Sequence, residues 1–291
     1  MSAVALDYSA AMEYHWLPIR NAKLEVAIGE FTDKVAVITG GASGIGKATA
    51  ALIAKEGGSV VICDCCDDAV EDTLAEYADR FPSIRGQVAD VASAADMERL
   101  IRFTVETFGG IDALVNNAGI QMFGTVVDLG EDDWDRTLAI NLKGAFLAAK
   151  FAVPEIRKRG GGAIVNVASV HAFATISNRV AYAASKTGLL GLTRAMALDH
   201  GPENIRVNVV CPGPVDTPML RNAWQRIYPG RPLSELMDEL AELLPVGYVG
   251  RPEEVAEMIA YLVGPRSGFV TGGEFKIEGG VSARYSIAPR P

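Results

Sequence analysis

From Phe31 onward the sequence alternates short, apolar, β-branched runs with longer amphipathic stretches, and this rhythm constrains the fold more than any other feature. Parallel strands need long crossover connections, and because they are buried on both faces they read as continuous apolar runs. With right-handed crossovers the alternation predicts an α/β fold, a three-layer doubly wound parallel sheet of Rossmann type with about seven strands and helices on both faces. We expect strands at 34–39, 59–63, 84–88, 112–115, 163–168, 206–210 and 274–277, and helices at 45–56, 67–79, 94–108, 132–157, 180–200 and 253–263.

No linker or shift in composition interrupts this rhythm, so we predict one Rossmann-type domain over 31–281. A long insertion at 214–250 carries five prolines and a predicted helix at 234–243, and it follows the strand at 206–210. Such a segment beyond the carboxyl end of a strand is typical of a substrate lid. Residues 1–30 form an N-terminal extension that is too apolar for a typical disordered tail, so we expect it to dock on its own subunit or a neighbour; residues 282–291 form a C-terminal tail.

The charge balance excludes several classes of function. The chain has 27 Lys+Arg against 36 Asp+Glu, a net charge of −9, which argues against an electrostatically driven nucleic-acid binder. The sequence has no apolar run of membrane-spanning length and no secretory or mitochondrial leader, so we expect no membrane partner and a cytoplasmic location. Cys63, Cys65, Cys66 and Cys211 are poorly spaced for disulfides and the histidines are scattered, so we expect free thiols and no metal site.

A glycine-rich turn joins the first predicted strand to the first helix. In Thr39–Gly46 the glycines permit a tight turn and let the backbone and the helix N-terminus approach a pyrophosphate. The spacing differs from the generic GxGxxG, and Ala48 stands where a P-loop needs Ser or Thr for magnesium, so a nucleoside triphosphatase is disfavoured. A tight turn without a ligand remains the alternative.

Asp64 ends the second predicted strand, where a dinucleotide-binding sheet places the adenosine ribose. A carboxylate there suits the ribose hydroxyls and repels a 2′-phosphate, and no Arg or Lys lies at 42–43 or 65–66 to neutralise one. The position therefore predicts NAD rather than NADP. The alternative is a merely polar strand end.

Tyr182 and Lys186 are four residues apart in a predicted helix and share one face of it. An ammonium group beside a phenol lowers the pKa of the phenol, which makes Tyr182 a candidate acid/base. The pair alone is weak evidence, since Tyr and Lys are common on solvated faces. Ser169, which ends the preceding strand, places a third polar group at the edge where open parallel sheets bind ligands.

Together these motifs resemble the short-chain dehydrogenase/reductase family, in its short single-domain branch. The match covers about residues 32–281 and rests on TGGASGIG at 39–46, Asp64, Asp90-Val91, NNAG at 116–119, Asn141, Ser169, YAASK at 182–186, and Pro212-Gly213 with Thr217. The one departure within the matched region is Glu278-Gly279-Gly280, where the family more often has Asp-Gly-Gly. The extension at 1–30 has no counterpart in the resemblance.

The resemblance implies a role for each matched residue. Tyr182 is the general acid/base, and Lys186 lowers its pKa and binds the nicotinamide ribose. Ser169 polarises the carbonyl or alcohol, and Asn141 helps to hold a water in a proton relay. The implied cofactor contacts are Gly40, Ser43, Gly44, Ile45, Gly46, Asp64, Asp90, Val91, Asn117, Ala118, Gly119, Tyr182, Lys186, Pro212, Gly213, Val215 and Thr217.

Mostly apolar residues surround the place expected for the substrate, beside Ser169 and Tyr182 and under the insertion. This composition favours a hydrophobic or cyclic alcohol or ketone, although some of these residues would serve equally to pack the lid. We name Gln121, Phe123, Val170, His171, Met219 and Trp224 as candidate substrate contacts, with Met122, Phe173, Leu220 and Tyr228 as further walls.

The sequence thus predicts an NAD-dependent oxidoreductase that interconverts a secondary alcohol and its ketone. One alternative is an NAD-bound epimerase or dehydratase, and another is a non-catalytic protein that senses NAD(H). Gly188 and Gly191 lower helix stability unless close packing requires them, and by resemblance we expect such helices to pair in a homotetramer or dimer.

Overall fold

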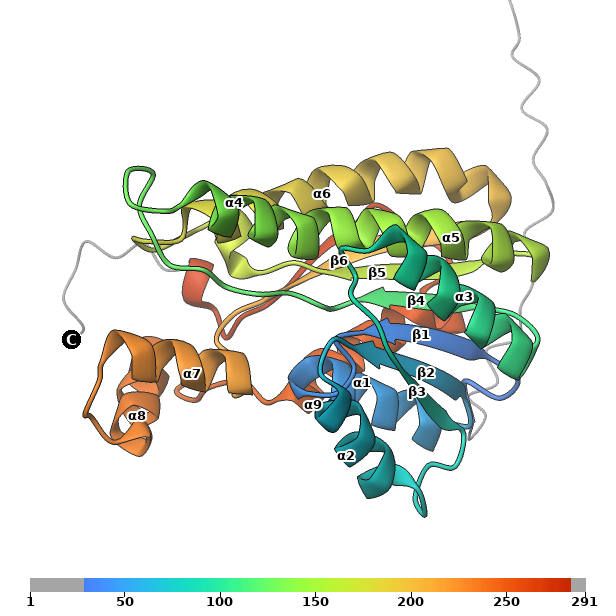
Figure 1. The fold of residues 1–291 in the computed structure, drawn as a ribbon, viewed down its shortest axis with the longest axis horizontal. Helices are drawn as coiled ribbons and strands as arrows, with labels where there is room; N and C mark the ends of the chain where they lie inside the picture. The colour runs from blue at the N-terminus through green and yellow to red at the C-terminus, as the bar shows by residue number, and fades with distance from the viewer. Residues whose placement is uncertain (1–28, 284–291) are drawn as a thin grey trace, which may run out of the picture.

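The computed structural model describes residues 29–283, which form one seven-stranded parallel sheet in the order β3-β2-β1-β4-β5-β6-β7 (Figure 1). This order is that of a doubly wound nucleotide-binding sheet with one strand added at its end. The predicted α/β architecture is therefore confirmed. The strands are β1 (Val35–Thr39), β2 (Ser59–Asp64), β3 (Ile84–Val88), β4 (Ala113–Asn116), β5 (Gly162–Val167), β6 (Ile205–Pro212) and β7 (Glu274–Ile277).

Helices cover both faces of the sheet, as Figure 1 shows. The chain runs from β1 to β3 along one face and crosses back to β4 along the other, which places the first two helices opposite the next four. One layer contains α1 (Gly44–Lys55), α2 (Asp67–Tyr77) and α9 (Pro252–Val263). The other contains α3 (Ala94–Phe108), α4 (Glu131–Leu138), α5 (Gly144–Lys158) and α6 (Val180–His200).

The core lies between the sheet and these two layers. All five residues of β1 are buried, and Ile38, Leu114 and Ile164 from the central strands are completely inaccessible to solvent. Removing such side chains from water stabilises the fold by about 2 kcal/mol each. The apolar, unalternating strands that predicted a parallel sheet are thus strands buried on both faces.

The predicted single helix at 132–157 is wrong in one respect, because a π-helical turn, Ala139–Lys143, separates α4 from α5. A π turn widens the helix and shifts the following residues around its axis. No residue preference announces such a turn, so the sequence could not reveal it. It contains Asn141, one of the predicted site residues.

The insertion at 214–250 contains two helices rather than the one predicted, α7 (Pro218–Ile227) and α8 (Leu233–Leu243). Thr217 caps α7, since its hydroxyl accepts a hydrogen bond from the amide of Leu220, and Pro218 occupies the first helical turn. This Thr-Pro signal was available in the sequence. A parallel bridge between Val215 and Gly250 joins the two ends of the insertion.

The predictions made for residues 1–28 and 284–291 lie outside the described residues. Of the predicted N-terminal extension only its end is described, where Glu30 pairs with Arg266 at 2.9 Å between carboxylate and guanidinium. Within 29–283 no helix is both long and apolar enough to cross a membrane.

Candidate active site

In the glycine-rich turn after β1, the backbone passes very close to the start of α1. Gly40 and Gly44 adopt positive φ angles of 62° and 51°, conformations that other residues rarely adopt. A Cβ on Gly46 would overlap the carbonyl oxygen of Gly40 and lie 2.6 Å from the amide nitrogen of the Asn117 side chain. The turn therefore requires glycine at these places for backbone shape and for packing.

Two side chains fasten this turn to the end of β4. The amide of Asn117 donates to the carbonyl oxygens of Thr39 at 3.1 Å and Gly40 at 2.9 Å. The hydroxyl oxygen of Thr39 accepts from the backbone amides of Asn117 and Ala118, each at 3.1 Å. The crevice where the strand order reverses is thus held rigidly by hydrogen bonds.

The N-terminus of α1 lies at the crevice, and no acidic side chain of its first turn occupies the place of a bound anion. Its N-cap residue, Ser43, makes no side-chain capping hydrogen bond, and no acidic residue lies in the first turn. The unpaired amides and the helix dipole at such an end favour a bound phosphate. The site therefore suits the pyrophosphate of a dinucleotide.

Asp64 ends β2 and lines the same cavity as Gly40 and Ser43. One of its carboxylate oxygens accepts from the amide of Cys65 at 2.9 Å, which leaves the second oxygen for a ligand. Asp90 and Val91 continue the wall beyond β3. These positions agree with an adenosine site at this end of the cavity.

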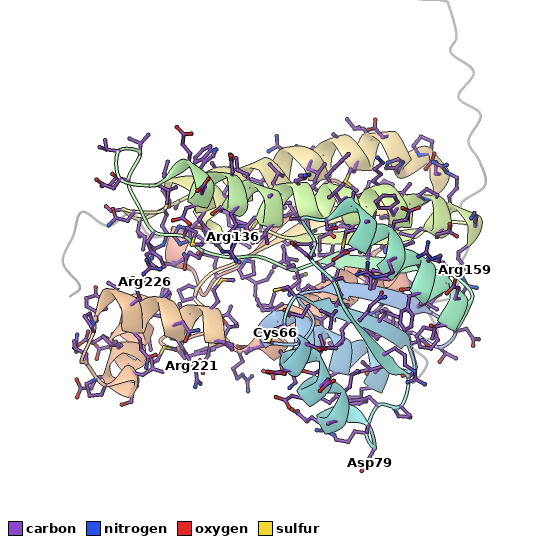
Figure 2. The ribbon with its side chains drawn as sticks, in the orientation of Figure 1. Cys66, Asp79, Arg136, Arg159, Arg221 and Arg226 are labelled. Carbon is purple, nitrogen blue, oxygen red and sulfur yellow. The ribbon has the colours of Figure 1, made fainter. Side chains whose placement is uncertain are left out.

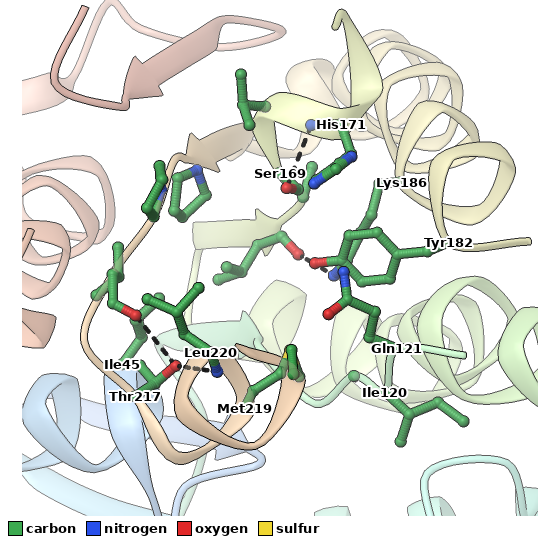
Figure 3. A pocket seen from close by; sticks show the side chains of 18 of the residues that line it. Ile45, Ile120, Gln121, Ser169, His171, Tyr182, Lys186, Thr217, Met219 and Leu220 are labelled. Carbon is green, nitrogen blue, oxygen red and sulfur yellow. Dashed lines mark hydrogen bonds between the residues drawn. The ribbon is translucent and has the colours of Figure 1, made fainter. Parts of the chain in front are cut away.

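Ser169, Tyr182 and Lys186 converge on the other end of the cavity, from the segment after β5 and from α6 (Figure 3). The hydroxyl oxygen of Ser169 accepts from the amide of His171 at 3.2 Å. The ammonium group of Lys186 donates to the carbonyl oxygen of Val167 at 2.7 Å and lies 5.6 Å from the centre of the Tyr182 ring. All three of these side chains are more than nine-tenths buried.

The pKa values differ from the sequence-based expectation. Burial raises the pKa of Tyr182, and only the Ser169 hydroxyl and the charge of Arg179 work in the opposite direction. Burial also lowers the pKa of Lys186 to about 8. The polypeptide alone therefore does not lower the pKa of the tyrosine through the lysine, because the same burial disfavours charge on both groups.

Asn141 lies within the π turn and is buried, and it is not among the residues that line the cavity. Its amide nitrogen donates to the carbonyl of Ile120 at 2.9 Å and to the hydroxyl of Ser185 at 3.0 Å. Its oxygen accepts from the amide of Ile120 at 2.8 Å. The side chain thus positions the segment after β4, next to Gly119 and Lys186.

One cavity of about 720 Å³ joins the two ends of this crevice. Its walls include the substrate candidates Gln121, Val170, His171, Met219 and Trp224, and residues of helices α7 and α8 line one side. Phe123, the remaining substrate candidate, is not among the residues that line this cavity. The guanidinium groups of Arg179 and Arg226 lie over its ring, 3.9 and 5.0 Å from the ring centre.

The expected cofactor residues fall along this cavity with two exceptions. Gly44 and Gly46 shape the turn and are not part of the lining. The residues that do line it are Gly40, Ser43, Ile45, Asp64, Asp90, Val91, Asn117, Ala118, Gly119, Tyr182, Lys186, Pro212, Gly213, Val215 and Thr217. A bound nicotinamide dinucleotide fits the residues present, because its pyrophosphate, its adenosine ribose and its reacting ring each have a matching surface.

Sequence reasoning missed two arginines of the cavity wall, Arg136 on α4 and Arg179 at the start of α6. Arg179 precedes Tyr182 by three residues, a spacing that puts both on one helical face, and this signal could have found it. His171 was found, and burial together with the Arg179 charge lowers its pKa to about 4. Its ring is therefore neutral at pH 7.

The chain is similar to many known oxidoreductases. A family model described as enoyl-(acyl carrier protein) reductase matches residues 40–282. Cyclohexanol dehydrogenase from Acinetobacter sp. is 35% identical over 89% of this chain and 99% of that protein. Human dehydrogenase/reductase SDR family member 4 is 37% identical over 87% of this chain and 88% of that protein.

Solved structures agree with these relatives. The crystal structure of levodione reductase superposes with a TM-score of 0.84, at 35% identity over 88% of this chain and 100% of that one. An actinorhodin polyketide ketoreductase with NADPH gives a TM-score of 0.82, at 35% identity over 87% of this chain and 100% of that one. The chain belongs to the short-chain dehydrogenase/reductase family of nicotinamide-dependent oxidoreductases.

Proposed function

We propose that the protein interconverts a secondary alcohol and its ketone, with NAD as the hydride acceptor or donor. The observation that carries this proposal is the convergence of Ser169, Tyr182 and Lys186 on a cavity whose other end is the open N-terminus of α1. A binding protein would need the second feature but not the first.

Each polar group has a distinct task in this reaction. Ser169 donates a hydrogen bond to the substrate oxygen, where negative charge develops. The Tyr182 hydroxyl transfers a proton to or from that oxygen, and Lys186 stabilises the phenolate that remains. The bound nicotinamide supplies the hydride chemistry, while the protein supplies placement and proton transfer.

Burial raises the pKa of Tyr182 and so opposes phenolate formation in the protein alone. A bound, oxidised nicotinamide would supply positive charge at this end of the cavity, and that charge would favour the phenolate. Asn141 acts through position, because its bonds to Ile120 and Ser185 hold the segment beside Lys186. We propose that a water of the proton relay lies there.

Asp64 is the basis for proposing NAD over NADP. Asp64 lines the cavity with one carboxylate oxygen that accepts no hydrogen bond from the described residues, and the residues that follow it, Cys65 and Cys66, carry no positive charge. The ketoreductase with NADPH shows that relatives of this fold also take the phosphorylated cofactor. The choice therefore depends on this one position.

We further propose a single catalytic domain over 31–281 with a lid at 214–250, in a cytoplasmic homotetramer. The helix that carries Tyr182 offers one clue to assembly. A Cβ on Gly188 would contact Leu142 of the same chain, whereas a Cβ on Gly191 would have no described atom within 4 Å apart from its chain neighbours and the nearby backbone of its own helix. Gly191 is thus available for the partner helix of a second subunit.

The experiment is a comparison of Tyr182→Phe with wild type, using NADH formation from a panel of secondary alcohols. We expect turnover to fall at least about 1000-fold while NADH binding, followed by its fluorescence, changes less than threefold. Tyr261→Phe, on α9 and away from the cavity, is the matched control. Full activity in Tyr182→Phe would reject the mechanism. If wild type binds NADH but turns over none of the alcohols, the alternative of a non-catalytic protein that senses NAD(H) is favoured.

A further inference from the structure

Arg179 is a buried cation without a counter-ion in the described part of the chain. Only 5% of the residue is exposed, yet no carboxylate within 29–283 pairs with it. One terminal nitrogen donates to the carbonyl oxygen of Asn178 at 3.0 Å, and Nε has no hydrogen-bond partner. A guanidinium group in this state is destabilising unless something else completes its surroundings.

A counter-ion for Arg179 would lie at the end of the cavity that contains Ser169 and Tyr182. Arg179 lines the cavity together with His171 and Tyr182, and its charge acts on the pKa of both. His171 is neutral and Lys186 already donates to a backbone carbonyl. A negatively charged ligand group in this part of the cavity would therefore meet Arg179 first.

The cavity is electrostatically asymmetric, and the asymmetry places positive charge at the substrate end. Its acidic lining residues, Asp64 and Asp90, both lie at the adenosine end. Arg179 and Lys186 line the opposite end; Arg136 on α4 also lines the cavity, and the guanidinium of Arg226 on α7 lies 5.0 Å from the centre of the Phe123 ring (Figure 2 labels Arg136 and Arg226). These exposed arginines would draw an anion toward the buried one.

Phe123 explains how Arg179 is held ready for a ligand. With its guanidinium 3.9 Å from the ring centre, the side chain is held by stacking and need not fold back to find a carboxylate of the protein. A guanidinium held in this way presents its nitrogens in a fixed plane, which suits the two oxygens of a carboxylate.

We propose that the substrate is a hydroxy acid or oxo acid whose carboxylate binds Arg179 while its hydroxyl or carbonyl oxygen contacts Ser169 and Tyr182. This inference rests on the proposed function for the reacting end, but the anion site itself does not depend on turnover. The apolar walls formed by Met219, Leu220 and Trp224 accommodate the carbon framework between the two polar ends.

The first test measures binding alone, with NADH-loaded protein and two ligands that have nothing to reduce, cyclohexanecarboxylate and cyclohexanecarboxamide. Calorimetry with wild type should give at least tenfold tighter binding of the carboxylate. In Arg179→Met this preference should disappear, and in Arg179→Lys it should be intermediate because the charge remains but the planar fork is lost. Equal affinity of wild type for the two ligands would overturn the proposal, whatever the variants do.

Arg221→Met is the matched control for these variants. It removes one positive charge from the same region, but Arg221 pairs with Asp216 at 2.6 Å and does not line the cavity. The carboxylate preference should persist in this variant within about twofold. Loss of the preference in Arg221→Met as strongly as in Arg179→Met would show that the effect is general electrostatics and would overturn the assignment to Arg179.

The second test uses 3-oxocyclohexanecarboxylate and its carboxamide as substrates. Arg179→Met should lower kcat/KM for the acid at least tenfold and for the amide less than threefold. Equal losses for both would show that Arg179 only shapes the site. Tyr182→Phe should lose turnover but keep the carboxylate preference in binding, so a failure of the catalytic mechanism and a failure of the anion site give different results.

Discussion

Lys186 makes the stability of this protein depend on pH in a way that can be calculated. The residue is only 3% exposed, and burial lowers the pKa of its ammonium group from the ordinary 10.5 to about 8. Between about pH 8 and pH 10.5, Lys186 has lost its proton in the folded chain but keeps it in the unfolded chain. The free energy of unfolding therefore rises with pH across this window, by about 3 kcal/mol in total and about 1 kcal/mol between pH 7 and pH 9.

Other buried groups act in the opposite direction, so the assay must isolate the lysine. Burial raises the pKa of Cys63 and Cys211 to about 12, and the folded chain keeps thiol protons that the unfolded chain loses above pH 8.5. The contribution of Cys63 is the same in wild type and Lys186→Met, and that of Cys211 changes little, because burial and Glu274 outweigh the charge of Lys186 among the causes of its raised pKa. The difference between the two proteins in free energy of unfolding should thus shift by about 1 kcal/mol from pH 7 to pH 9, in favour of wild type at the higher pH.

Urea unfolding followed by circular dichroism, at one protein concentration, with reductant and without cofactor, measures this difference. Lys55→Met, at the exposed end of α1, controls for the general loss of one lysine charge. A difference between wild type and Lys186→Met that stays constant from pH 7 to pH 9 would refute the reasoning. So would a shift of equal size in Lys55→Met.

Three further predictions concern the cofactor end and the assembly. Asp64→Ala should lower the ratio of kcat/KM for NAD to that for NADP at least tenfold, because the repulsion of a 2′-phosphate is removed; an unchanged ratio contradicts the assignment. Gly46→Ala should weaken NADH binding at least tenfold and destabilise the fold by about 1–3 kcal/mol, since its methyl group overlaps the Gly40 carbonyl; fluorescence titration and urea unfolding measure the two effects. Gly191→Ala should raise stability by about 1 kcal/mol if the helix face is free in solution, and should instead dissociate the proposed tetramer in light scattering if a second subunit packs there.

The parts of the site that local sequence determines were predictable. The glycine turn, Asp64 and the pair Tyr182 and Lys186 each follow from spacing within one turn or one helix. The fold was predictable for the same reason, because strands buried on both faces carry a continuous apolar signal that needs no knowledge of their neighbours.

The parts that depend on distant segments were not predictable. Phe123 reads as a pocket wall, but its surroundings are set by Arg179 from α6 and Arg226 from the lid, which are 56 and 103 residues away in the sequence. The spacing of three residues could assign Arg179 to the same helix face as Tyr182, but its burial depends on segments that are distant in the sequence. The raised pKa of Tyr182 is likewise a property of the whole enclosure, not of the nearby lysine.

The bridge between Val215 and Gly250 has an evolutionary consequence. The amides of Asp216 and Gly250 donate to the carbonyls of Gly250 and Pro214 at 2.8 and 3.0 Å, so the lid leaves and re-enters the fold through one hydrogen-bonded neck. The entropy of closing a loop grows only slowly with its length, so lids of other lengths and sequences could occupy the same neck at little expense to the sheet. Substrate choice could then change through replacement of the insertion at 214–250 alone, while the residues proposed for hydride and proton transfer are inherited unchanged.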